Sequence, residues 1–223
     1  MKTARTTLKR RPGRGAHDAA TVHAILDEAL VCHLGFAVDE QPYVIPTIHA
    51  RRGERLYVHG AAANRMLGAL RGGARCCVTA TLLDGLVLAR SAFHHSVNYR
   101  SVVVLGRAEA VESTGEKRAA LDAIVEKVMR GRSAACRAPS DAELLATSVL
   151  RLPIDEASAK LRSGPPLDDE DDYALPHWAG VVPLRIAPGA PQPDPRLAPG
   201  TAFPHELPHD VAAGCGGRRR VGV

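Results

Sequence analysis

A histidine, a run of small residues and an arginine follow one another in the segment ERLYVHGAAANRMLGALRGG, residues 54–73. The apolar run that ends at His59 has the pattern of a strand, and a helix is expected to begin after Asn64. A helix N-terminus leaves backbone N–H groups unpaired and carries a partial positive charge, to which Arg65 adds a full one. This combination predicts an anion site, most naturally for a phosphate group.

The small residues between the histidine and the helix give this predicted anion site room for a ligand. Side chains are minimal from residue 60 to residue 63, so a flat or bulky group can lie against the main chain there. His59 would face whatever the phosphate is attached to, and an imidazole that titrates near neutrality is suited to proton transfer. The same residues also fit a simpler interpretation, in which Asn64 caps the helix, Arg65 lies on the surface and His59 is half-buried at a barrel end.

Short apolar segments with tight connections must position these residues. Strands are predicted at 31–38, 43–50 and 55–60, and the turns DEQP and RRGE join them into an antiparallel meander. Pro46 cannot donate a ladder hydrogen bond, so it marks a sheet edge, a bulge or a place where something other than a strand approaches. Further strands are predicted at 74–83, 96–111, 148–154, 157–163 and 180–186. Such a set of antiparallel strands around one apolar interior favours a closed or nearly closed barrel.

Helices are predicted beside these strands at 18–30 and, briefly, at 65–70, the first from apolar residues that recur with helical spacing. Two more helices are expected to begin at capping boxes, one formed by Ser113 and Glu116 and the other by Ser140 and Glu143. The acidic run DDEDD at 168–172 is expected in an exposed loop. The sequence therefore predicts a mainly β protein with added helices.

One main domain is the default for a chain of 223 residues with 45% hydrophobic content. Nine of the 29 Lys and Arg residues lie within residues 1–15 and 218–220, which leaves 20 against 24 Asp and Glu in a slightly acidic body. We expect a disordered basic tail at 1–16, alternatively an organelle-targeting segment, a domain at 17–195 and a Pro/Gly-rich basic tail at 196–223. This charge distribution argues against nucleic acid as a partner. The absence of a membrane-spanning run or secretory signal predicts a cytoplasmic protein.

Several other side chains invite a metal or haem interpretation, namely His33, His49 and the adjacent pair His94 and His95. Neighbouring histidines on one strand point to opposite faces, so this pair cannot easily bind one ion and is expected in a loop that lines a pocket or on the surface. The five cysteines show no C-x-x-C spacing. No metal site, zinc framework or disulfide framework is therefore predicted.

The order of several segments resembles the FMN-binding split-barrel proteins related to pyridoxamine-phosphate oxidase. These segments are YVIPTIHARRGERLYVHGAAANRMLGAL, NYRSVVVLGRAEAV, EKRAALDAIVEKV and SAKLRSGPP with the later HWAGVVPL, and together they span about residues 17–195. The chain is most similar to the nitroimidazole-reductase-like branch of these flavoproteins. The resemblance implies a six-stranded antiparallel split barrel with flanking helices, which forms a homodimer with FMN at the subunit interface.

The same resemblance implies three groups of cofactor-binding residues: a stretch beside the flavin ring, the phosphate site with its approach, and part of a long strand. In that order, the groups are Pro46, Thr47 and Ile48; His59, Gly60, Ala61, Asn64 and Arg65; and Tyr99, Arg100 and Ser101. His59 would take part in the chemistry. Arg100 has two possible roles, stabilising anionic reduced flavin or pairing with an acidic neighbour. Many family members carry a Ser or Thr and an Arg-Lys pair at the phosphate site, so phosphate binding rests on fewer groups here.

Three functions of different classes follow from this sequence. The first is a flavin-dependent oxidoreductase that acts on a small aromatic or nitro compound through His59, with a nicotinamide as a possible electron donor. The second is a flavin- or haem-binding protein of the same fold with little turnover, which a reduced phosphate site would suit. The third is a split-barrel scaffold whose basic tails recruit partners. The sequence does not specify the substrate, the electron donor or the direction of electron transfer.

Overall fold

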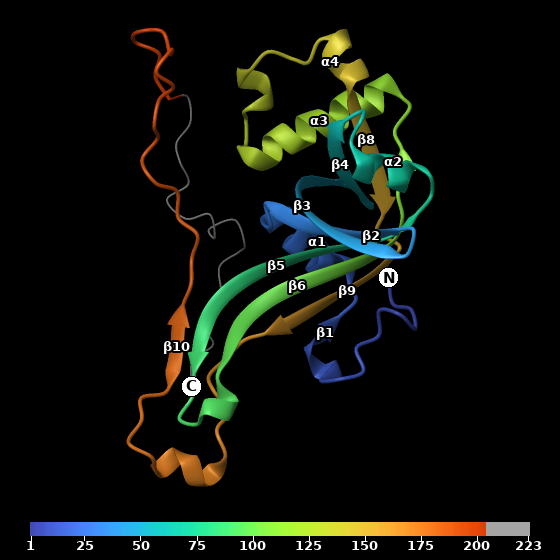
Figure 1. Ribbon diagram of the computed structural model, residues 1–223. Helices are drawn as coiled ribbons and strands as arrows, with labels where there is room; N and C mark the ends of the chain where they lie inside the picture. The colour runs from blue at the N-terminus through green and yellow to red at the C-terminus, as the bar shows by residue number, and fades with distance from the viewer. Residues whose placement is uncertain (204–223) are drawn as a thin grey trace. The chain divides into compact units, whose positions relative to one another are not determined.

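The computed structural model describes residues 1–203, which form ten β-strands and four α-helices (Figure 1). The strands are β1 (Gly15–Ala16), β2 (Val31–Val38), β3 (Gln41–Arg52), β4 (Arg55–Ala61), β5 (Arg75–Leu88), β6 (Ser96–Arg107), β7 (Glu109–Ala110), β8 (Thr147–Pro153), β9 (Glu156–Arg162) and β10 (Gly180–Pro183). The helices are α1 (Ala19–Glu28), α2 (Arg65–Arg71), α3 (Thr114–Val128) and α4 (Asp141–Ala146). The predicted mainly β architecture with added helices is confirmed, but six strands is too low a number. Two-residue strands such as β1 and β7 are too short to leave an alternating pattern in the sequence.

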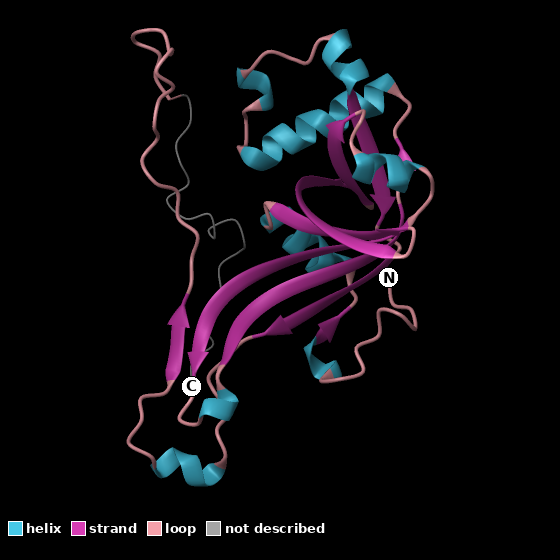
Figure 2. Cartoon of the chain, in the orientation of Figure 1, coloured by secondary structure: helices cyan, strands magenta, loops and turns pink. Residues whose placement is uncertain are grey.

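Nine strands pair in the order β1-β9-β6-β5-β2-β3-β4-β8-β7, and β10 pairs with β5, in a sheet that stays open rather than closing into a barrel. The helices flank this sheet: α1 and α3 contact β3, α4 contacts β8, and α2 contacts both β2 and β8 (Figure 2). None of the helices within residues 1–203 is both long enough and apolar enough to span a membrane.

Two compact units share the chain. The first comprises Met1–Leu82 and Val97–Gly164, and the second comprises Leu83–Ser96 together with the chain from Pro165 onward. In the second unit, β10 pairs with the end of β5 from Gly180 opposite Leu88 to Pro183 opposite Gly85. The boundary between the units falls within β5, which is 14 residues long and contributes residues to both.

The helix starts follow the polar residues that were expected to cap them. Asp18 accepts a hydrogen bond from the backbone N–H of Thr21 at 2.8 Å, and Ser140 and Glu143 form a complete capping box. At the start of α3 only the serine half of the predicted box forms, because the Glu116 carboxylate binds other residues instead. The predicted capping positions are therefore confirmed, and one of the two boxes is incomplete.

The hydrophobic core of the first unit lies between the inner face of the sheet and helices α1 and α2. Its fully buried members include Val22, Ile25, Leu26, Leu67, Leu70, Val78, Val102, Val104 and Leu150. Burial alternates along β2, where Cys32, Leu34 and Phe36 face the core and the residues between them do not. This alternation fixes which face of each strand is available to a ligand.

The N-terminal segment, predicted as a disordered tail at 1–16, is instead packed on the first unit. Gly15 and Ala16 pair with Lys160 and Ala159 of β9. The Arg5 guanidinium forms an ion pair with Glu156, and the segment's Thr6 is buried. The prediction is wrong because both the counter-charge and the backbone partner come from β9, far along the chain. Of the predicted C-terminal tail at 196–223, residues 204–223 lie outside the described part of the chain.

The acidic run at 168–172, predicted in an exposed loop, begins with a carboxylate that is fully inaccessible to solvent. The Asp168 side chain in the second unit accepts hydrogen bonds from the backbone N–H groups of Arg90 at 3.0 Å and Ser91 at 3.3 Å, and its ion pair with the Arg90 guanidinium is 3.1 Å long. The prediction is wrong for this residue because these donors compensate the loss of water.

Buried polar groups close the C-terminus of α1. The Nζ of Lys127 on α3 donates to the carbonyl oxygen of Leu26 at 2.7 Å and also to that of Asp27, and the Nε2 of His49 donates to the same Leu26 oxygen at 2.9 Å. These donors satisfy carbonyls that the end of a helix leaves unpaired, and the lysine charge complements the helix dipole. Burial lowers the pKa of His49 to about 4 and that of Lys127 to about 8.

The buried imidazole of His49 predicts an acid-sensitive fold. The unfolded chain binds a proton at the ordinary histidine pKa of 6.5 but the folded protein only near 4, so stability present above pH 6.5 is lost as the pH falls. The free energy of unfolding should fall by about 1.4 kcal/mol per pH unit in this window, or about 3 kcal/mol in total. Urea unfolding at several pH values measures this slope. His49→Gln should flatten the slope and His95→Gln should not, and equal slopes in all three proteins would contradict the assignment.

Candidate functional site

Strands β3 and β4 separate in the middle of their course, and the predicted site residues line both sides of the gap. The two strands pair from Arg52 opposite Arg55 up to His49 opposite Val58, and no further. Had the ladder continued in this register, residues 48, 47 and 46 would lie opposite residues 59, 60 and 61. Beyond this point β3 continues to pair with β2, and β4 with β8. We call this opening between residues 46–48 and 59–61 the split.

The β3 side of the split is an unpaired strand edge. Residues 41–48 pair with β2 on one side only, so backbone groups on the other side have no partner strand. Pro46, which lies in this part of β3 opposite His33 of β2, was predicted to mark such an edge, and that prediction is confirmed. On the side of β3 that faces β4, residues 46–48 therefore have no partner strand.

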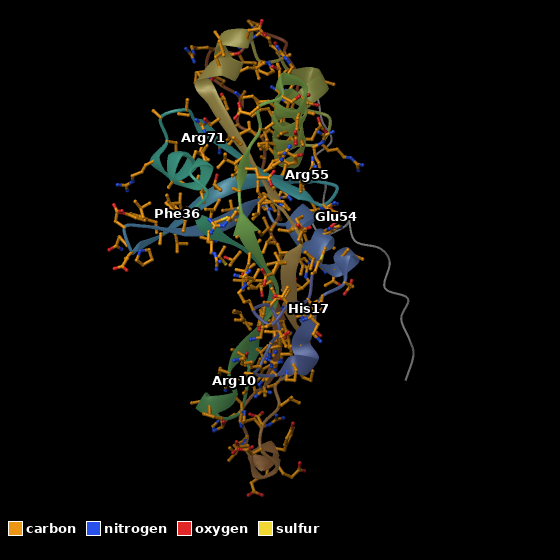
Figure 3. All side chains as sticks on the ribbon, turned by 90° about the vertical axis from the view of Figure 1, so that its right-hand side faces the viewer. Arg10, His17, Phe36, Glu54, Arg55 and Arg71 are labelled. Atoms are coloured by element: carbon orange, nitrogen blue, oxygen red, sulfur yellow. The ribbon has the colours of Figure 1, made fainter. Side chains whose placement is uncertain are left out.

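The β4 side of the split is closed by α2. The Asn64 side chain caps this helix by accepting a hydrogen bond from the backbone N–H of Leu67 at 3.2 Å, and the backbone N–H of Asn64 donates to the Ala61 carbonyl at 2.9 Å. A Cβ on Gly60 would lie only 3.0 Å from a methyl group of Leu67, so glycine lets the helix pack close to the strand. At the far end of α2, Arg71, which Figure 3 labels, donates to the hydroxyl of Ser148 on β8 at 2.5 Å.

Arg65 reaches from α2 back to β3. Its guanidinium lies 4.9 Å from the centre of the Tyr43 ring, and that ring stacks on Phe36 of β2 with centroids 5.5 Å apart. This cation–π contact holds a positive charge on the β3 side of the helix start while the side chain stays exposed. Sequence reasoning missed Tyr43, because an aromatic residue within a strand is ordinary and only the folded register shows what lies above it.

His59 is half-buried at the split, and its Nδ1 atom is buried without a hydrogen-bond partner among residues 1–203. Burial lowers the pKa of His59, so at neutral pH the ring is mostly uncharged rather than poised between its two forms. A buried polar atom without a partner is costly, and a ligand that supplies the missing partner recovers that free energy.

The third predicted group, Tyr99, Arg100 and Ser101, does not join the split within one chain. These residues lie on β6, and β5 and β2 separate that strand from β3. The Arg100 guanidinium forms a two-point ion pair with Glu28 of α1, with one of its contacts at 2.7 Å. Of its two predicted roles, the structure therefore shows the pairing with an acidic neighbour.

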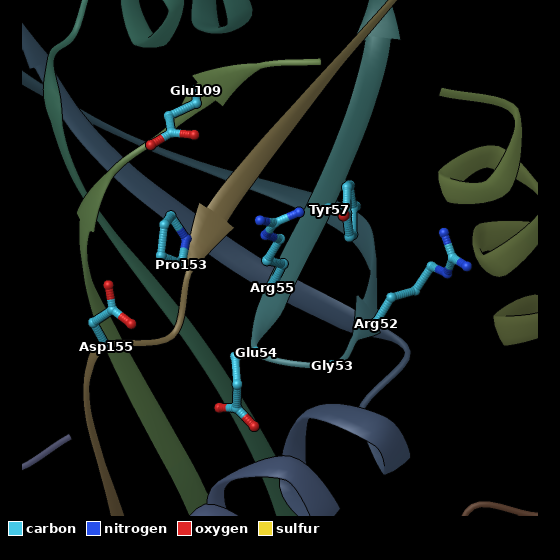
Figure 4. Close-up of a pocket in the computed structure, with 8 residues that line it drawn as sticks. All are labelled: Arg52, Gly53, Glu54, Arg55, Tyr57, Glu109, Pro153 and Asp155. Atoms are coloured by element: carbon cyan, nitrogen blue, oxygen red, sulfur yellow. The ribbon is translucent and has the colours of Figure 1, made fainter. Parts of the chain in front are cut away.

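A cavity of about 660 Å³ opens at the opposite end of β4 around the β3–β4 turn (Figure 4). It is lined by Arg52, Gly53, Glu54, Arg55, Tyr57, Glu109, Pro153 and Asp155. Some of its charges are paired within the protein, as in the contacts of 2.9 Å between Glu109 and Arg151 and of 3.5 Å between Arg55 and Glu116. None of the predicted site residues lines this cavity.

Comparison with known proteins gives both a family and similar solved structures. A family model described as pyridoxamine 5'-phosphate oxidase matches residues 18–161, and no curated protein matches the chain. The flavocytochrome Anf3 from Azotobacter vinelandii is 44% identical with a TM-score of 0.85, over 91% of this chain and 94% of that one. A FAD and haem binding protein from Mycobacterium smegmatis is 37% identical with a TM-score of 0.82, over 86% and 94%.

A more distant structure comes from Bacteroides thetaiotaomicron and is described by a proposed role in 5-nitroimidazole antibiotic resistance. It is 25% identical with a TM-score of 0.54, over 66% of this chain and 85% of that one. Together with the family model, these similarities confirm the split-barrel fold class and the resemblance on which it was predicted.

The Asn64 side chain is predicted to stabilise α2, the helix that closes the β4 side of the split. Asn64→Ala removes the acceptor for the Leu67 N–H and should lower the free energy of unfolding by about 1 kcal/mol. Asn64→Asp keeps an acceptor and should retain the wild-type stability. Chemical denaturation of the three proteins measures the difference, and an alanine variant as stable as wild type would show that the cap does not hold the helix.

Proposed function

The chain belongs to the pyridoxamine 5'-phosphate oxidase family, and on this premise we propose that it is a flavoprotein whose flavin lies in the split between β3 and β4. The observation that carries the proposal is that two separate strands and a capped helix bring eight predicted residues to one opening. The sequence predicted FMN, and one similar protein is named for FAD. The proposed cofactor is therefore a flavin, either FMN or FAD.

The residues around the split suit the parts of a flavin. The unpaired edge of β3 presents main-chain groups where the polar edge of the ring would lie, and the short side chains of residues 60–63 leave room along its face. Arg65 supplies the cation for the phosphate. The buried Nδ1 of His59 is a polar atom that a bound ligand would satisfy.

A bound flavin supplies the electron chemistry, and the protein binds it, orients a substrate and handles protons. His59 is mostly neutral because burial lowers its pKa, so it holds a proton on one ring nitrogen and offers the other nitrogen as an acceptor. In this proposal it positions the polar group of a small aromatic or nitro compound, takes up a proton from solvent on its free nitrogen and passes a proton to the substrate from the resulting imidazolium. The similarity to a protein linked to nitroimidazole resistance supports this class of substrate, and a nicotinamide is the proposed electron donor.

We also propose a homodimer in the cytoplasm, with the flavin at the subunit interface. Tyr99, Arg100 and Ser101 lie away from the split of their own chain, and a second subunit would bring its own copies of them to the cofactor. The second unit exposes large apolar side chains, including Phe93 at 89% and Trp178 at 67%, which a partner chain would cover.

Haem is a second candidate cofactor. The observation that favours it is that two similar structures, 44% and 37% identical over most of the chain, are named as a flavocytochrome and as a FAD and haem binding protein. We propose that this chain likewise carries haem together with flavin. Its visible spectrum tests both parts: flavin and haem absorb separately, and a protein that takes up neither cofactor would refute the proposal.

Arg65→Ala tests the flavin site. Loss of a charge-assisted contact to phosphate should weaken flavin binding by about 1–3 kcal/mol, or roughly 5-fold to 150-fold. Quenching of flavin fluorescence during titration measures the dissociation constant. Arg52→Ala, which removes an exposed arginine at the opposite end of β4, is the matched control. Equal affinities in both variants would place the phosphate elsewhere.

His59→Ala tests the chemistry separately from binding. Flavin should stay bound, whereas turnover should fall about 10²-fold to 10⁴-fold because the proton-transfer group is lost. Anaerobic reduction by a nicotinamide, followed by reoxidation with a nitroaromatic compound, measures the two half-reactions. Unchanged rates in both would remove His59 from the mechanism.

A further inference from the structure

The outer face of the β2–β3 hairpin is apolar and faces away from the core. Residues opposite each other in an antiparallel pair share a face, and three such pairs lie here: Val31 with Ile48, His33 with Pro46, and Gly35 with Val44. The residues between them on β2 are buried in the core. On the outer face Val44 is 67% exposed, and Val31 and Ile48 are exposed as well. A large apolar surface of this kind calls for something that covers it.

This face continues onto β5 without any charged side chain. His33 lies opposite Thr79 and Gly35 lies opposite Cys77, so an imidazole stands between a proline on one side and a threonine on the other. The His33 ring is exposed and makes no hydrogen bond within residues 1–203. Strands about 4.8 Å apart and residue pairs about 6.8 Å apart make this a broad, flat surface. We call it the His33 face.

Cations lie at the hairpin end of the His33 face, around a cavity of about 620 Å³. The cavity is lined by Gly35 and Val44 of that face, by Arg75 at the start of β5 and by Arg107 at the end of β6. Phe36, Tyr43 and Cys76 of the core side also line it, and His33 lies beside it rather than in its wall. None of the residues that line it is acidic. Arg5 also lines it and is paired with Glu156, and the hydrogen bond from Arg5 lowers the pKa of that carboxyl, with a smaller contribution from the charge of Arg75. Arg107 forms no ion pair with the part of the chain that the structure describes.

We propose that the His33 face binds haem, with the His33 imidazole as an axial ligand of the iron and with Arg75 and Arg107 beside the propionates. This inference rests on the proposed function, which assigns haem to the protein but not to any place in it. A porphyrin is a flat apolar ring with two carboxylates, and its iron binds neutral imidazole. An apolar face, a free imidazole and two arginines at one end match these three requirements.

Several other histidines of the described chain are already engaged, whereas His177 is exposed and lies in the second unit, away from β2 in the sequence. His49 is buried and bonded to Leu26, His23 lies 3.1 Å from the Glu54 carboxylate, and His95 lies 3.0 Å from the Ser91 carbonyl. His59 lies at the split, where the flavin is proposed. The geometry also brings the two cofactors together, because Pro46 faces His33 across the hairpin and lies on the unpaired edge of the split. Only the β3 backbone would then separate haem from flavin.

Haem reconstitution with cavity rescue tests the assignment. Purified apoprotein is titrated with haemin, and the Soret band is recorded for wild type, His33→Gly and the matched exposed control His95→Gly. Only His33→Gly should lose the wild-type spectrum, and added imidazole should restore it by entering the vacated position. The variant removes an exposed side chain, and a circular dichroism spectrum like that of wild type checks that it folds. Arg75→Ala combined with Arg107→Ala should weaken haemin binding about tenfold or more without moving the Soret band.

The outcomes separate this inference from the proposed function. If wild type binds no haemin, the haem part of the proposed function fails and the inference fails with it. If wild type and His33→Gly bind haemin with the same spectrum, the protein carries haem at another place and only the inference is overturned. If Val44→Asp dissociates a haem-free dimer, the His33 face is an interface between subunits and the inference is likewise overturned.

Discussion

The separation of β3 from β4 beyond His49 is the constraint on which the site depends. A strand edge without a partner normally invites unwanted pairing, and here Pro46 and the bare segment after β4 keep the two edges apart. Helix α2 then fixes the width of the opening, since its cap bonds to the end of β4 and its first arginine rests on a β3 tyrosine. An opening built in this way presents backbone on one side and a desolvated imidazole on the other.

The point of separation is also where the most strongly desolvated histidine of the first unit lies. His49 is the last β3 residue that pairs with β4, and its ring is tied to the C-terminus of α1 together with Lys127. Helices α1 and α3 therefore contact β3 close to His49, the residue at which the pairing of β3 with β4 ends. Because side chains alternate along β3, His49 points into the core and its neighbour Ile48 points outward. The core, the split and the His33 face therefore meet at these two residues.

The sequence predicted the parts of this fold that depend on local rules. The bounds of β2, the start of α2 at Asn64 and the edge character of Pro46 follow from alternation, capping preference and the missing proline donor. What it missed depends on partners that are distant along the chain. Tyr43 matters only because Arg65 lies over it, Arg5 is ordered by Glu156, and Asp168 is buried because two backbone N–H groups face it. Register and tertiary contacts decide these cases, and neither leaves a local pattern.

The pairing of β1 with β9 has a consequence for biosynthesis. Gly15 lies opposite Lys160, so the first strand to leave the ribosome waits for β9, the last strand of its unit, before it can dock. Contacts of such long sequence separation slow folding. Until they form, the outer edge of β9 stays open to neighbouring chains, and the nascent protein is most prone to aggregate during this interval.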